Sequence, residues 1–149
     1  MIKLAASVIV YETKAVVGTT ALTDAGYYLQ IEQAACSDLS VSGLTAALRE
    51  ITATGNPPTR ALLRDEFKQR VNPVLHALKV RSWLALAKKG AGFGIYWEDE
   101  QTVVSVSRLD KRGRFEDDSE HERRLPADAP IEAVAQAIID DLRRRGVVQ

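Results

Sequence analysis

The side chains best suited to acid–base or nucleophilic chemistry are few and scattered. His76 lies in the apolar run Pro-Val-Leu-His-Ala-Leu, and His121 lies between Glu120 and Glu122. On a strand those glutamates would point away from the histidine, so the three could not share a metal ion. The single cysteine, Cys36, has no neighbouring base in the sequence to activate it as a nucleophile, and we expect a small buried side chain. The sequence therefore predicts no catalytic residues, no metal site and no enzymatic activity.

Two further patterns could suggest a bound ligand. The glycine run 90–94 follows an expected helix and enters an expected strand, whereas a phosphate-binding loop precedes a helix. The acidic run 116–120 lacks the Asp-x-Asp-x-Asp-Gly pattern of a calcium loop, which favours a solvated loop or a protein-binding surface over a metal site. We therefore expect no cofactor.

Charge is balanced over the whole chain but unevenly distributed along it. The 149 residues carry 20 lysines and arginines and 20 acidic residues, which argues against a strongly basic nucleic-acid binder. Residues 60–95 contain eight bases and two acids, while residues 96–128 contain ten acids and six bases. Both segments can be ordinary solvated surface, or either can meet a partner of opposite charge.

The hydrophobic pattern predicts one α+β domain spanning residues 1–149. Its first half has strands at 3–12, 15–22 and 27–33, then a helix that carries Val41, Leu44, Leu48 and Ile51 on one face. The second half has a strand at 73–80, a short helix at 83–89, a hairpin at 93–97 and 102–109, a loop at 110–118, an edge strand at 119–125 and a helix at 131–142.

These elements predict antiparallel sheet with two main helices and a possible βββα pseudo-repeat, similar to the repeated design of Whirly-like proteins. Alternation over residues 93–97 places Phe93, Ile95 and Trp97 on one buried face and Tyr96 on the other. Asp128 is the expected N-cap of the last helix, with Pro130 in its first turn.

The cysteine content and the apolar runs bear on the compartment. One cysteine, no convincing leader segment and no apolar run of about 20 residues predict a cytoplasmic protein that does not cross a membrane.

Several stretches resemble immunity proteins of bacterial contact-dependent growth inhibition systems. In those proteins a Val-Lys-Ser-Trp element precedes a short helix, a strand with an aromatic residue and a second strand. The matching segments here are 72–83, which contains Val-Arg-Ser-Trp at 80–83, then 92–97 and 102–107. The segments 25–28, 55–57 and 130–134 fit the same outline, so the similarity follows most of the chain in order.

The resemblance implies a cytoplasmic, non-enzymatic protein with one partner. That partner is the C-terminal toxin domain of a large secreted exoprotein, often a nuclease that attacks tRNA or other RNA. The immunity protein blocks the active site or an exosite of the toxin. No binding residue carries over from the family, because the contact surface differs between pairs, and a monomer is the default expectation.

Charge suggests where such a partner would bind. A nuclease is basic where it holds RNA, so an acidic surface suits its inhibitor. On this ground alone we expect a toxin-binding surface formed by Glu98, Asp99, Glu100, Glu116, Asp117 and Asp118.

Three other functions stay open at this point. The first is a nucleic-acid-binding α+β domain that uses the basic segment 60–89, with Trp83 available for stacking on bases. The second is a small enzyme or ligand carrier with His76 or His121 in a pocket. The third is a structural or assembly subunit.

Overall fold

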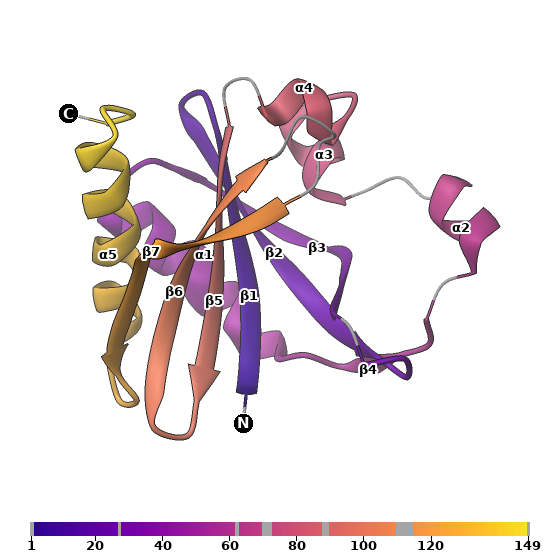
Figure 1. The fold of residues 1–149 in the computed structure, drawn as a ribbon, viewed down its shortest axis with the longest axis horizontal. Helices are drawn as coiled ribbons and strands as arrows, with labels where there is room; N and C mark the ends of the chain where they lie inside the picture. Colours follow the sequence, from indigo (N-terminus) through magenta and orange to yellow (C-terminus); the bar gives the residue numbers. More distant parts are fainter. Residues whose placement is uncertain are drawn as a thin grey trace.

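A six-stranded antiparallel sheet forms the centre of the molecule (Figure 1). The structure, a computed structural model, describes residues 2–26, 28–61, 63–69, 73–87, 90–109 and 115–148, with the backbone alone at 19, 28–33, 59, 64, 67, 68, 83, 87, 108, 109 and 115–120. Its strands are β1 (Ile2–Tyr11), β2 (Lys14–Thr23), β3 (Tyr28–Asp38), β5 (Gly90–Glu98), β6 (Gln101–Leu109) and β7 (Phe115–Pro126). A two-residue strand, β4 (Pro58–Thr59), pairs in parallel with β2.

Five helices complete the described elements: α1 (Val41–Thr54), α2 (Arg64–Gln69), α3 (Pro73–Leu78), α4 (Trp83–Ala87) and α5 (Ile131–Arg144). Among the described residues, none of these helices is long and apolar enough to span a membrane.

The strand order β3-β2-β1-β5-β6-β7 contains the same unit twice. Strands β1 to β3 form a meander that leads into α1, and strands β5 to β7 form a second meander that leads into α5. The two units join where β1 and β5 pair antiparallel, with Val8 opposite Phe93. The predicted α+β class and βββα pseudo-repeat are therefore confirmed.

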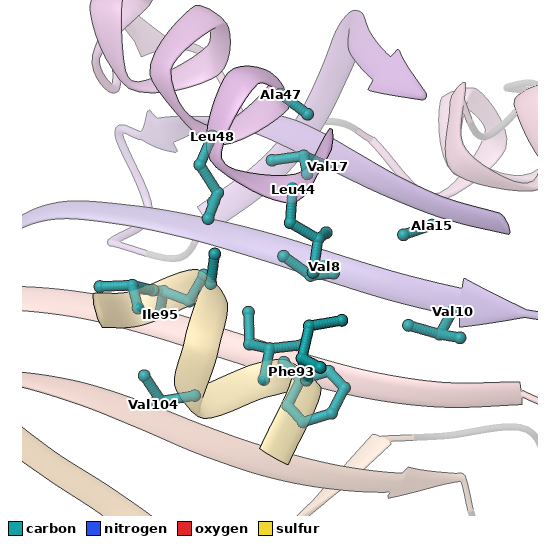
Figure 2. Close-up of a cluster of buried hydrophobic side chains, with 14 of the residues drawn as sticks. Val8, Val10, Ala15, Val17, Leu44, Ala47, Leu48, Phe93, Ile95 and Val104 are labelled. Atoms are coloured by element: carbon teal, nitrogen blue, oxygen red, sulfur yellow. The ribbon is translucent and has the colours of Figure 1, made fainter. Parts of the chain in front are cut away.

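The two long helices cover one face of the sheet and bury the main core (Figure 2). Leu44 and Leu48 of α1 face Val8 of β1, and all three side chains are fully buried. Phe93 and Ile95 are buried in the same cluster, and Trp97 packs partly buried against it, as the alternation over 93–97 predicts.

Two short helices, α3 and α4, cover part of the opposite face. Val74, Leu78 and Leu86 pack there against Ile9 of β1 and Val16 of β2. Because β1 is covered on both sides at this end, its sequence is almost continuously apolar.

The prediction of a strand at 73–80 is wrong, because residues 73–78 form the helix α3. Pro73 begins the helix, where its missing amide hydrogen costs nothing. Val74 and Leu78 are four residues apart, so both reach the same buried surface.

Two elements begin at residues other than those predicted from the sequence. Pro130, rather than Asp128, is the N-cap residue of α5, and its side chain makes no capping hydrogen bond. Strand β7 begins at Phe115, so the predicted loop at 110–118 ends sooner. Residues 88–89 of the predicted helix and 110–114 of the predicted loop lie outside the described residues.

Asn56 closes a gap between β1 and β2. The last backbone pair between these strands is Ala6 with Thr19, and beyond it the side-chain amide of Asn56 bonds to both strands. The Ala5 amide donates to Asn56 Oδ1 at 2.7 Å, and Asn56 Nδ2 donates to the Ala5 carbonyl at 2.8 Å and to the Thr20 carbonyl at 2.9 Å. This one side chain therefore joins the end of α1 to two strands of the sheet.

Candidate protein-binding face

Three of the six acidic residues expected in a binding surface lie together at the β5–β6 turn. Glu98 ends β5, and its Oε1 accepts a hydrogen bond from Gln101 Nε2 at 3.0 Å. Asp99 forms an ion pair with Lys3, with 3.1 Å between Nζ and Oδ1. Glu100 is exposed in the turn.

The other three lie at the far end of β6. Glu116, Asp117 and Asp118 occupy β7 opposite Arg108, Ser107 and Val106, while the turn end of β6 at Gln101 lies opposite Pro126. Six residues of strand at about 3.3 Å each separate the two groups by about 20 Å. Their side chains are outside the described set, and the structure does not bring the two acidic groups together.

The histidines and the cysteine do not meet in one place. His76 is exposed on α3, and His121 is half-buried in β7. Cys36 is exposed rather than buried, because it lies on β3 at the edge of the sheet. Within the described residues, no group of three or more histidine, cysteine, aspartate or glutamate side chains could hold a metal ion.

The basic segment 60–89 is described only in part. Arg70, Lys88 and Lys89 lie outside the described residues, as do the side chains of Arg64, Lys68 and Trp83.

Arg60, in the described part of that segment, is engaged within the chain. Its Nη1 and Nη2 donate to the two carboxylate oxygens of Glu66 at 2.7 and 2.6 Å, and the Leu63 amide donates to Glu66 at 3.0 Å. The hydrogen bonds from Arg60, followed by that from Leu63, lower the pKa of Glu66 to about 2.

A hollow of about 220 Å³ lies on the sheet face opposite α1 and α5, beyond the part that α3 and α4 cover. We call it the β6 hollow. Val103 and Ser105 line it and are 7% and 5% exposed, so they form its floor. The complete lining is Ile2, Tyr96, Glu98, Gln101, Val103, Ser105, Glu122 and Arg124.

The pleat of the strands explains this lining. Alternate residues of β5 and β6 point to the same face, which brings Tyr96 and Glu98 beside Val103 and Ser105. An irregularity in the β1–β5 register between Ile2 and Leu4 places Ile2 opposite Glu98, so it reaches the same face. The alternation over 93–97 predicts the side on which Tyr96 lies, but the joining of four separate segments depends on strand register.

The side chains around the β6 hollow are held in place by local contacts. The Tyr96 ring packs over Gly94, since a Cβ built there would lie 2.9 Å from the Tyr96 hydroxyl. Glu122 and Arg124 form an ion pair at 3.2 Å. Glu98 is fixed by Gln101, and among the described residues no lysine or arginine pairs with it.

The hollow and the adjoining turn together are acidic. Four carboxylates, of Glu98, Asp99, Glu100 and Glu122, accompany the two cations Lys3 and Arg124. Both cations already pair with one of these carboxylates, so the remaining negative charge favours a positively charged partner.

The chain shares its fold with two solved structures of bacterial proteins. One is a Neisseria meningitidis protein of unknown function, with a TM-score of 0.68, 13% identity and coverage of 95% of this chain and 94% of the other. The second is a chain of the CdiA-CT/CdiI toxin and immunity complex from Yersinia pseudotuberculosis, with a TM-score of 0.68, 13% identity and coverage of 95% and 96%. No family model matches the sequence, and no curated protein matches it.

Proposed function

We propose that this chain is a single-domain, non-enzymatic immunity protein. It binds the toxin domain of a contact-dependent growth inhibition system in the cytoplasm and neutralises it by covering the active site or an exosite. The toxin is a nuclease, such as one that cleaves tRNA. The immunity protein acts as a monomer.

The observation that carries this proposal is the fold shared with a chain of a toxin and immunity complex over nearly its whole length. The sequence resemblance over residues 72–83, 92–97 and 102–107 points to the same class of protein. The acidic β6 hollow and turn add a physical reason, because a nuclease surface that holds RNA is positively charged.

We further propose that the two acidic groups, 98–100 and 116–118, contribute to toxin binding. Since about 20 Å separates them along β6, a standard interface of about 800 Å² per partner can include one group or extend to both. Variants that change each group separately can therefore locate the interface.

Co-expression tests the proposal directly. The toxin domain encoded immediately upstream is produced in cells with or without this chain, and growth and co-purification are measured. We expect restored growth and a stable one-to-one complex. A toxin domain from an unrelated system serves as the control, and it should still kill the cells.

Continued killing without complex formation would overturn the pairing. Salt-sensitive binding of single-stranded RNA by the purified chain, at physiological ionic strength, would then favour a role for the basic segment 60–89.

A further inference from the structure

We propose that the β6 hollow receives one arginine side chain of the partner protein, whose guanidinium pairs with Glu98. The identity of the partner as a toxin domain rests on the proposed function. The chemistry of the hollow follows from its own residues.

The size of the hollow suits one side chain. Pockets for small-molecule ligands commonly measure about 300–1,000 Å³, and this one measures about 220 Å³. Its floor of Val103 and Ser105 is well buried, and Ile2 beside it is 41% exposed. A long side chain that enters from a partner would lose water along its stem while its charged end meets the polar wall.

Glu98 supplies the charge for this contact. Its Oε1 accepts one hydrogen bond, from Gln101, while an ionised carboxylate offers about four acceptor positions. Arg124, the cation in the wall, pairs with Glu122. Among the described residues, Glu98 is thus the carboxylate of the hollow that lacks a cation, and a cation from a partner would supply it.

Arginine fits better than lysine for two reasons. Its planar guanidinium presents parallel N–H groups that match a carboxylate, whereas the lysine ammonium is a point charge. Tyr96 also lines the hollow, and guanidinium groups stack favourably on aromatic rings. Because the Tyr96 ring is held over Gly94 and Glu98 is held by Gln101, the site needs little ordering when the partner binds.

The first test compares the near-isosteric variant Glu98→Gln with Glu50→Gln, which removes one charge from an exposed position of α1, on the other face of the sheet. Affinity for the toxin domain is measured by calorimetry. We expect E98Q to weaken binding about tenfold or more, mainly through faster dissociation, and E50Q to change it by less than about twofold. Equal effects of both variants, or no effect of E98Q, would overturn the arginine site while leaving the immunity function in place.

The second test does not need the toxin. The chain is titrated with N-acetyl-arginine amide, and NMR shifts are followed at Tyr96, Glu98 and Ser105. We expect saturating shifts at these residues that are lost in E98Q. The neutral citrulline analogue, which has the same length without the charge, should produce none. Equal shifts with citrulline, or no shifts with arginine, would overturn the proposal whatever the outcome of toxin binding.

Discussion

At the scale of single residues, Asn56 bonds to two strands that are distant from it in sequence. Its amide satisfies the backbone of Ala5 in both directions and also bonds to Thr20, at a point where β1 and β2 no longer pair with each other. Asparagine suits this position because it carries a donor and an acceptor in the same plane, as the backbone does.

Replacing Asn56 with alanine should lower the free energy of unfolding by about 1–3 kcal/mol, because the Ala5 amide and the Thr20 carbonyl lose the hydrogen bonds that Asn56 makes with them. Urea unfolding followed by circular dichroism measures the change. As a control, Gln136→Ala removes an exposed amide that bonds within α5, to Asp140, and it should cost less than about 0.5 kcal/mol. An N56A protein as stable as Q136A would contradict this role.

Glu66 provides a prediction about pH. Its pKa lies near 2, below the ordinary value of 4.5, so its contacts with Arg60 and Leu63 are fully stabilising above about 4.5. They are lost as the pH falls toward 2. Carboxyl-carbon NMR should show that Glu66 becomes protonated only near pH 2, and Arg60→Gln should move the pKa of Glu66 back toward 4.5. Arg81→Gln, at another exposed arginine of the basic segment 60–89, should leave the pKa of Glu66 unchanged. An unchanged Glu66 pKa in R60Q would refute the role given to Arg60.

At the scale of elements, the N-terminus of α1 depends on one hydroxyl. Ser40 Oγ accepts the Gly43 amide at 3.0 Å, and the same hydroxyl donates to Asp38 Oδ1 at 2.6 Å. Space around this cap is restricted, because a Cβ at Gly43 would clash with the side chains of Asp38 and Ser37.

Ser40→Ala should therefore destabilise the protein by about 1 kcal/mol, as is typical for the loss of an N-cap. Glu50→Ala, at an exposed position of the same helix, should change stability by less than about 0.5 kcal/mol, because glutamate and alanine are both good helix formers. Thermal unfolding of the two variants distinguishes these outcomes. If S40A melts at the wild-type temperature, the cap contributes nothing.

Long, strongly patterned elements could be predicted from the sequence, and short ones could not. The apolar stripe from Ile131 to Leu142 and the alternation after Gly92 each cover enough residues to separate a helix from a strand. The run of six residues that forms α3 is too short for that test, and tertiary packing on Ile9 and Val16 decides its structure. Pro73 at its start was the one local signal of a helix.

At the scale of the whole molecule, charge should govern how fast the toxin associates. We expect the triple variant E98K/D99K/E100K to slow association by about tenfold at low salt and to flatten its dependence on ionic strength. The matched variant E116K/D117K/D118K reverses three charges at the other end of β6. Stopped-flow rates show which group faces the toxin, and unchanged rates in both variants would rule out an acidic binding surface.

The β6 hollow could not be predicted because its parts are distant in sequence. Ile2, Tyr96, Ser105 and Arg124 come from four strands, and they meet only through the registers of β1, β5, β6 and β7. A shift of one residue in any of these pairings would turn the side chains of that strand to the other face. Charge counts alone led to the prediction of a binding surface at 98–100 and 116–118, but they gave no information on the distance between the two groups.

Because β1 pairs with β5, the sheet cannot be completed until the ribosome has synthesised β5. About 80 residues separate the two strands, so at about 5–20 residues per second β1 waits roughly 4–16 seconds for its central neighbour. During that interval the first meander exposes one edge of an apolar strand, with Val8, Ile9 and Val10 beside unpaired amide and carbonyl groups. Such an edge readily accepts a strand from another chain, so nascent copies on neighbouring ribosomes compete with β5 for it.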